Sequence, residues 1–203
     1  MNIHELIHPA IIVVDMINGF TKSGPLADPE IAKAARPIAS LIEETTQSRQ
    51  ALLFVKDTHE EGCLEFESFP PHCLKGTDES EIMDELKGFA DQASVIEKNS
   101  ISTFTAPGFS EWLKTLKIPA DIVITGCCTD LCVLQLVLSL QSYINQNDLR
   151  GLRIVVPVDC VDTYHIEGIH DAKETNRFAL ENMKANGVKV ISGFDYGKPE
   201  EKE

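Results

Sequence analysis

Cys132 has the residue type and the position of a nucleophile. An apolar strand is predicted over Asp121–Thr125, Gly126 follows it, and a helix is predicted from Asp130. Thr129 or Asp130 can cap this helix, so Cys132 falls in its first turn, where backbone N–H groups are unpaired and the helix dipole is positive. Such a position lowers the pKa of a thiol and presents N–H groups to an oxyanion. An inert buried cysteine fits this position equally well.

Two charged residues also follow apolar strand candidates. Asp15 comes directly after the first strand, and Lys98 follows the third. In an open α/β sheet, sites form outside the carboxyl ends of the strands, where the strand order reverses. A strand order of 3-2-1-4-5-6 makes the first and fourth strands neighbours, so Asp15 would meet Cys132. A carboxylate beside a thiol can take its proton and return it to a leaving amine, whereas the simpler interpretations are a turn cap for Asp15 and a solvated side chain for Lys98.

The irregular stretch Lys56–Thr77 contains Asp57, His59, Glu65 and His72, whose side chains are of types that bind metals. A loop of roughly 20 residues in a compact domain is either functional or a misassigned element. Two imidazoles with two carboxylates suit a divalent ion such as Zn²⁺, Mn²⁺ or Fe²⁺. Solvated charges are the simpler interpretation from composition alone.

The elements that must position these residues alternate between strand and helix patterns. Such repeated β-α-β order predicts an α/β fold, a three-layer doubly wound sheet of six mainly parallel strands with helices on both faces. We expect a single domain over residues 1–203, with a frayed tail at about 198–203. The predicted strands are Ala10–Val14, Ala51–Val55, Ala93–Ile96, Asp121–Thr125, Arg153–Val158 and Val188–Ile191, and the predicted helices are Pro29–Gln47, Glu79–Phe89, Phe109–Leu116, Asp130–Tyr143 and His170–Asn186.

Composition restricts the partners. The net charge of −14 disfavours nucleic acid and anionic membranes, and no apolar run reaches the about 20 residues that span a bilayer. The first nine residues lack the features of a signal peptide, so we expect a cytoplasmic protein. The six cysteines are then expected to be reduced, with Cys160 as a small core residue.

The segment Gly126-Cys-Cys-Thr-Asp-Leu-Cys132-Val133 resembles the nucleophile motif of the isochorismatase-like cysteine hydrolases, a superfamily that includes nicotinamidases. The resemblance implies that Cys132, rather than Cys127 or Cys128, is the nucleophile. It also implies a cis peptide bond between Cys127 and Cys128. That bond would turn the N–H of Cys128 toward an oxyanion, beside the N–H of Cys132.

The segment Asp15-Met-Ile-Asn-Gly19-Phe20 resembles the Asp-Met-x-Asn-x-Phe motif of the same family, and Lys98 is followed by Ser and Phe as the family's lysine is. The resemblance implies that Asp15 is the base and that Lys98 stabilises negative charge beside it. Gly19 departs from the family, which usually has Asp there, and we expect the departure to be tolerated.

The sequence of this loop, with Phe69-Pro-Pro-His72 followed by Gly76-Thr77, resembles the metal loop of nicotinamidases. The resemblance implies one divalent ion, with Zn²⁺ expected and Mn²⁺ or Fe²⁺ as alternatives, and it implies that the metal binds the pyridine nitrogen of the substrate. Phe20 and Phe69 would stack on a flat ring, and Tyr164 and His165 could also face the site. The implied ligands are Asp57, His59, Glu65 and His72, with Glu67 as an alternative to Glu65.

Together these motifs predict a nicotinamidase-like amidohydrolase that converts nicotinamide and water to nicotinate and ammonia through a thioester on Cys132, as part of pyridine nucleotide salvage. The expected partner is a small carboxamide, and we expect a homo-oligomer. One alternative keeps the fold and the three catalytic residues but acts on another small amide or carbamoyl compound. A second is a non-catalytic metal-binding protein, which would keep its ligand binding after Cys132→Ala.

Overall fold

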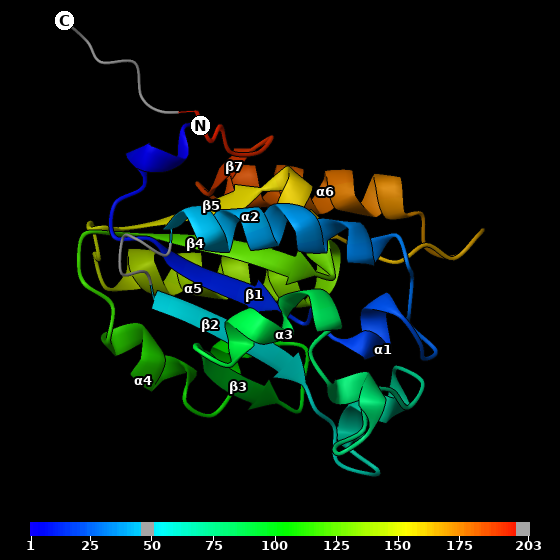
Figure 1. The fold of residues 1–203 in the computed structure, drawn as a ribbon. Coiled ribbons are helices and arrows are strands. Elements are labelled where there is room, and N and C mark those ends of the chain that lie inside the picture. Colours follow the sequence, from blue (N-terminus) through cyan, green and yellow to red (C-terminus); the bar gives the residue numbers. More distant parts are fainter. Residues whose placement is uncertain (46–50, 198–203) are drawn as a thin grey trace, which may run out of the picture.

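A twisted parallel sheet forms the middle of the molecule (Figure 1). The computed structural model describes residues 1–45 and 51–197. All strand pairs are parallel, and the order β3-β2-β1-β4-β5-β7, with the short β6 beside β4, confirms the predicted topology. The strands are β1 (Ala10–Val14), β2 (Ala51–Asp57), β3 (Ser94–Lys98), β4 (Ala120–Cys127), β5 (Leu152–Pro157), β6 (Val161–Asp162) and β7 (Lys189–Ile191).

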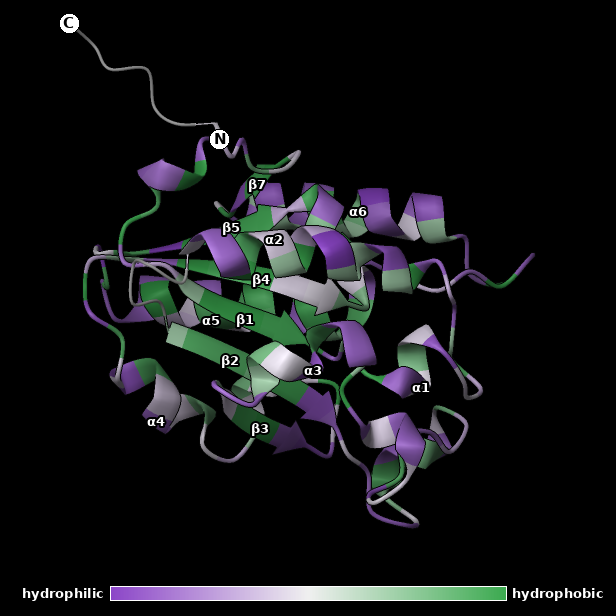
Figure 2. Cartoon of the chain, viewed as in Figure 1, coloured by the Kyte–Doolittle hydropathy of each residue, from purple (hydrophilic) through white to green (hydrophobic). Residues whose placement is uncertain are grey.

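Helices cover both faces of the sheet, so the central strands β1 and β4 are buried along their whole length. In β1, Ile11 and Val13 face one buried cluster, and Ala10, Ile12 and Val14 face the other. Figure 2 shows β1, in the middle of the sheet, as hydrophobic along its length. The first cluster includes side chains of α1 (Asn18–Thr21), α2 (Ala35–Thr45) and α3 (Asp84–Ala90), and the second those of α4 (Phe109–Lys114), α5 (Leu134–Gln146) and α6 (Ala172–Ala185).

Three predicted helices differ from the structure. The helix predicted from Pro29 begins instead with a 3-10 turn, Ile31–Ala34, ahead of α2. The helix predicted over Glu79–Phe89 is interrupted, because Ile82 forms a β-bridge with Ile17 and the backbone N–H of Met83 donates to the Met16 carbonyl. The helix predicted from Asp130 begins instead with a π-helical turn, Thr129–Val133, ahead of α5. The predicted helix end at Gln47 and the predicted frayed tail lie outside the described residues.

The carboxyl ends of the strands lie together on one side of the molecule. In Figure 1 the arrowheads point toward α1 and the loop after β2. That loop contains a short 3-10 turn, Leu64–Glu67, and a bridge between His59 and Leu74. Within the described residues, we find no helix of the length and apolar character needed to cross a membrane.

Candidate active site

The first and fourth strands meet at a glycine next to the nucleophile motif. Val14 pairs with Gly126, which has a φ of 104°, and a Cβ on Gly126 would lie 1.9 Å from the Val14 carbonyl oxygen. Only glycine accepts both this φ and this close approach. The end of β1, which carries Asp15, is thereby fixed against the end of β4, which carries the cysteines.

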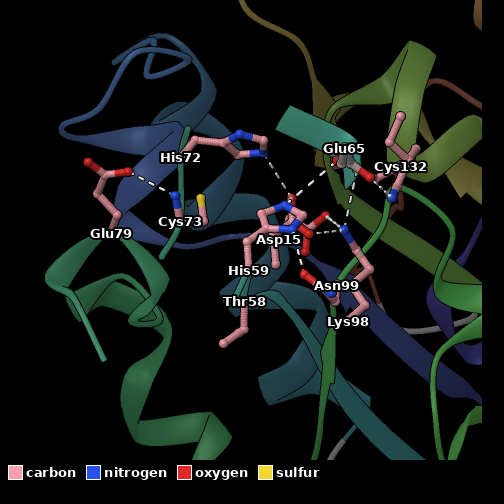
Figure 3. Close-up of polar contacts among 12 residues, drawn as sticks. Asp15, Thr58, His59, Glu65, His72, Cys73, Glu79, Lys98, Asn99 and Cys132 are labelled. Atoms are coloured by element: carbon pink, nitrogen blue, oxygen red, sulfur yellow. Dashed lines mark hydrogen bonds and ion pairs between the residues drawn. The ribbon is translucent and has the colours of Figure 1, made fainter. Parts of the chain in front are cut away.

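Lys98 is the hub of the polar contacts at this edge (Figure 3). Its ammonium nitrogen lies 2.9 Å from Asp15 Oδ2, 2.8 Å from Asp57 Oδ1 and 3.6 Å from Cys132 Sγ. The sequence predicted that Lys98 follows its strand, but it is the last residue of β3 and pairs with Asp57 at the end of β2. Lys98 is 1% exposed rather than a solvated surface lysine.

Electrostatic attraction stabilises the buried cluster of Lys98, Asp15 and Asp57. Burial alone would lower the pKa of Lys98, but the carboxylates of Asp15 and Asp57 outweigh burial and raise it. Burial opposes ionisation of Asp57 as well, yet the Lys98 ammonium, with a smaller contribution from the neighbouring His59 and His72 side chains, lowers its pKa. Lys98 is therefore a cation and Asp57 an anion in the folded protein.

Asp15 is in a different state from Asp57. Burial raises the pKa of Asp15 to about 6, against the attraction of Lys98. Its backbone has a φ of 50°, in the left-handed region that is unfavourable for a non-glycine residue and that often marks functional sites. The Cys127 thiol donates to the Asp15 carbonyl at 3.1 Å, and the Asp15 N–H donates to the Val55 carbonyl at 3.0 Å, so two neighbouring strands hold this conformation.

Cys132 lies in the π-helical turn, beside Asp15. One oxygen each of Asp15 and Asp57 and the Cys132 sulfur all lie within 4.8 Å of one another. The expected low thiol pKa is wrong: full burial raises the pKa of Cys132, although Lys98 opposes the shift. Cys132 is therefore a thiol that needs a base, and a carboxyl with a pKa near neutrality is next to it.

The start of this helix also differs from the predicted cap. Neither Thr129 nor Asp130 caps the turn, since no side chain bonds to its first N–H groups. Asp130 instead contacts His170, with Oδ2 2.9 Å from Nε2. The peptide bond between Cys127 and Cys128 is cis, as the resemblance implied.

The loop after β2 brings a second group of side chains to Asp57. One ligand atom from each of Asp57, His59, Glu65 and His72 lies within 4.8 Å of the others. Asp57 Oδ2 is 3.3 Å from His59 Nε2 and 3.4 Å from His72 Nε2. Glu65 is in this group, with Oε1 3.7 Å from His59 Nε2, whereas the alternative Glu67 is exposed.

The hydrogen-bond pattern of these side chains fits a cation. His72 Nδ1 lies 2.8 Å from the Pro70 carbonyl, which can only accept, so Nδ1 carries a proton. In this tautomer His72 Nε2 carries a lone pair 3.4 Å from Asp57 Oδ2, so a cation between the two atoms would satisfy both. His59 Nε2 is buried without a hydrogen bond, while its Nδ1 is 3.1 Å from Asn99 Oδ1. Ring nitrogens oriented by such outer contacts are typical of zinc ligands.

A pocket lies over this edge. Both predicted ring-binding residues, Phe20 and Phe69, line it, as does Tyr164, while His165 is exposed. Three lining residues were not predicted, because an isolated apolar side chain gives no chemical signal in a sequence. They are Leu26, Ile101 and Leu131.

The departure at Gly19 has a steric reason. A Cβ on Gly19 would lie 2.5 Å from Cys73 Sγ and 3.0 Å from the Glu79 carbonyl oxygen. The Glu79 carboxylate accepts from the Cys73 N–H at 2.9 Å, directly after His72 (Figure 3). In this chain the space beside position 19 is therefore filled by Cys73, and Glu79 anchors the end of the loop.

The chain is similar to known proteins over most of its length. The isochorismatase domain matches residues 9–194. The chain belongs to the isochorismatase family. It is 32% identical to Nicotinamidase 1 of Arabidopsis thaliana over 212 residues, which cover 92% of this chain and 86% of that protein. This similarity confirms the predicted nicotinamidase-like branch, and the chain is an amidohydrolase, as the sequence predicted.

Solved structures share the fold. An N-carbamoylsarcosine amidase from Thermoplasma acidophilum matches with a TM-score of 0.70 at 26% identity, over 92% of this chain and 100% of that one. A pyrazinamidase from Pyrococcus horikoshii in complex with zinc matches with a TM-score of 0.70 at 24% identity, over 91% of this chain and 99% of that one. The predicted α/β sheet is thus a family property.

Proposed function

We propose that this chain is a metal-dependent nicotinamidase, which hydrolyses nicotinamide to nicotinate and ammonia with Cys132 as the nucleophile. The observation that carries the proposal is the position of Lys98, whose ammonium contacts both Asp15 and Cys132 on one side and Asp57 of the histidine cluster on the other. The nucleophile and three members of the cation-binding cluster thereby line one pocket, and the base is buried beside the nucleophile.

The first half of the reaction forms a thioester. Asp15 takes the proton of the Cys132 thiol, and the sulfur forms a bond to the carbonyl carbon of the amide. The Lys98 ammonium stabilises the thiolate, and the N–H groups of Cys128 and Cys132 donate to the oxyanion. Asp15 then gives its proton to the departing nitrogen, so the C–N bond breaks and ammonia leaves.

The second half returns the enzyme to its starting state. Asp15, again a carboxylate, takes a proton from a water molecule, whose oxygen attacks the thioester carbonyl. The C–S bond breaks, the acid leaves as nicotinate, and Cys132 recovers its proton. A raised pKa suits Asp15 for both directions of proton transfer, because donor and acceptor forms are then both accessible near neutral pH.

The ligands of the proposed metal are Asp57, His59, Glu65 and His72, and their donor set suits Zn²⁺, with Mn²⁺ or Fe²⁺ as alternatives. When bound, such an ion supplies a Lewis acid that holds the pyridine nitrogen of the substrate. Phe20 and Phe69 pack against the ring and orient its carboxamide toward Cys132.

Hydrolysis of another small amide or a carbamoyl compound is the second candidate, because an N-carbamoylsarcosine amidase has the same fold. The cluster of two histidines and two carboxylates favours a substrate with a ring nitrogen instead. A non-catalytic role does not account for a buried thiol beside a buried carboxylate and a buried lysine.

The test is ammonia release from nicotinamide by wild-type protein, before and after chelation, beside Cys132→Ala and Cys160→Ala. Cys160 is the matched control because it is also a buried cysteine but is not among the residues that line the pocket. We expect activity in wild type and Cys160→Ala, loss on chelation with recovery on adding Zn²⁺, and no activity in Cys132→Ala. A metal-replete wild type that releases no ammonia from nicotinamide would overturn the proposed substrate.

A further inference from the structure

A second polar cluster lies on the outer side of the nucleophile turn. His170 Nε2 is 2.9 Å from Asp130 Oδ2, and Asp130 is two residues before Cys132. His170 Nδ1 is 2.8 Å from the Tyr164 carbonyl oxygen. Both nitrogens of one imidazole therefore join the segment after β6 to the turn that carries the nucleophile.

The imidazole also packs on the ring that lines the pocket. The Tyr164 and His170 rings stack with centroids 4.1 Å apart and an interplanar angle of 17°. Tyr164 belongs to the pocket lining, with Cys128 and Cys132. His170 thus supports Tyr164 through both its carbonyl and its ring, while His170 is not itself a lining residue.

The segment around Tyr164 is tied at its other side as well. The His165 N–H donates to Asp28 Oδ2 at 2.9 Å, and the Asp28 N–H donates to the carbonyl of Phe20, another lining residue, at 3.0 Å. An antiparallel β-bridge between Ile166 and His170 then turns the chain back toward α6. In Figure 1 this segment projects beyond the carboxyl edge of the sheet, ahead of α6.

We propose that His170 is a positioning residue that, through Asp130 and Tyr164, fixes the Tyr164 ring as a wall for the flat ring of the substrate. The inference rests on the proposed function in taking an aromatic amide as the substrate. A partly buried carboxylate and a carbonyl on opposite nitrogens leave the imidazole one orientation, and stacking passes that orientation to Tyr164. Preorganised aromatic walls favour binding of a planar ligand because less conformational freedom is lost.

The test uses His170→Phe, which keeps a ring for stacking but removes both hydrogen bonds, and Tyr164→Ala, which removes the wall. We expect each to raise the KM for nicotinamide about 5- to 10-fold, the range expected for one aromatic contact, with kcat changed little. Because His170 acts through Tyr164, the double variant should be no worse than Tyr164→Ala alone. The control is His4→Phe, at an exposed histidine outside the pocket lining, which should behave as wild type.

Binding measurements separate this inference from the proposed function. Nicotinamide affinity is measured by calorimetry in Cys132→Ala, with and without His170→Phe, and should fall by the same factor as KM rises. Independent, additive effects of the two substitutions, or a lower melting temperature with unchanged KM and affinity, would overturn the inference. Binding without turnover in wild type would refute the proposed reaction but not the inference, whereas no binding to Cys132→Ala would overturn both.

Discussion

Replacing Lys98 by Met should expose the electrostatic balance of the site. The substitution keeps a side chain of similar length but leaves the carboxylates of Asp15 and Asp57 buried without their shared cation, which lies 2.9 and 2.8 Å away in the wild type. Removing one partner of a buried ion pair costs about 3–5 kcal/mol, and we expect a loss of this size in the free energy of unfolding at pH 8. Catalysis should be lost as well. The measurement is urea unfolding of the metal-free proteins.

The loss of stability in the Lys98→Met variant should depend on pH in a specific direction. The pKa of Asp15 is already raised to about 6, and without Lys98 it should rise further, while the pKa of Asp57 should rise as well. Folding of the variant therefore takes up more protons as the pH falls than folding of the wild type does. The variant should therefore recover stability relative to wild type as the pH falls from 8 to 5. Lys114→Met is the control, because Lys114 forms an exposed pair with Glu111 and should change nothing measurable. A loss no larger than that of the control, or one independent of pH, would refute the reasoning.

Three further results are expected. Because Asp15 must be a carboxylate to accept the thiol proton and its pKa is about 6, kcat/KM should fall about tenfold per pH unit below pH 6; a flat profile from pH 7 to 5 would exclude Asp15 as the base. Gly126→Ala should cost at least about 3 kcal/mol or prevent folding, judged by circular dichroism, since the new Cβ would meet the Val14 carbonyl; a soluble variant of wild-type stability would contradict the described packing. Asn99→Ala should weaken Zn²⁺ binding about 10- to 100-fold in a competition titration, because Asn99 orients His59; unchanged affinity would show that this contact is not part of a metal site.

Much of the site follows from the sequence because it depends on strand ends. Asp15 and Cys132 lie together because β1 and β4 are neighbours, which the alternating strand and helix patterns already predict. The two histidines of the loop meet at Asp57, as the resemblance implied.

Other features depend on register and burial, which a single sequence does not contain. The contact of Lys98 with Asp57 requires that the last residues of β2 and β3 pair, and both strands extend beyond their apolar cores. The predicted direction of the Cys132 pKa shift was wrong. The position at the start of a helix favours the thiolate, but full burial opposes it more strongly and raises the pKa. The contact of Asp130 with His170 joins residues 40 positions apart, and neither lies in a pattern that predicts it.

The central claim is that Cys132 forms a covalent bond with the acyl group of a carboxamide. The direct measurement is mass spectrometry of metal-replete wild-type protein mixed with nicotinamide, quenched in acid within one turnover and digested. The account predicts a nicotinoyl group on the peptide that contains Cys132, absent from Cys132→Ala, which should also release no ammonia. Ammonia release by Cys132→Ala at the wild-type rate, or an acyl group on Cys127 or Cys128 in its place, would contradict the account.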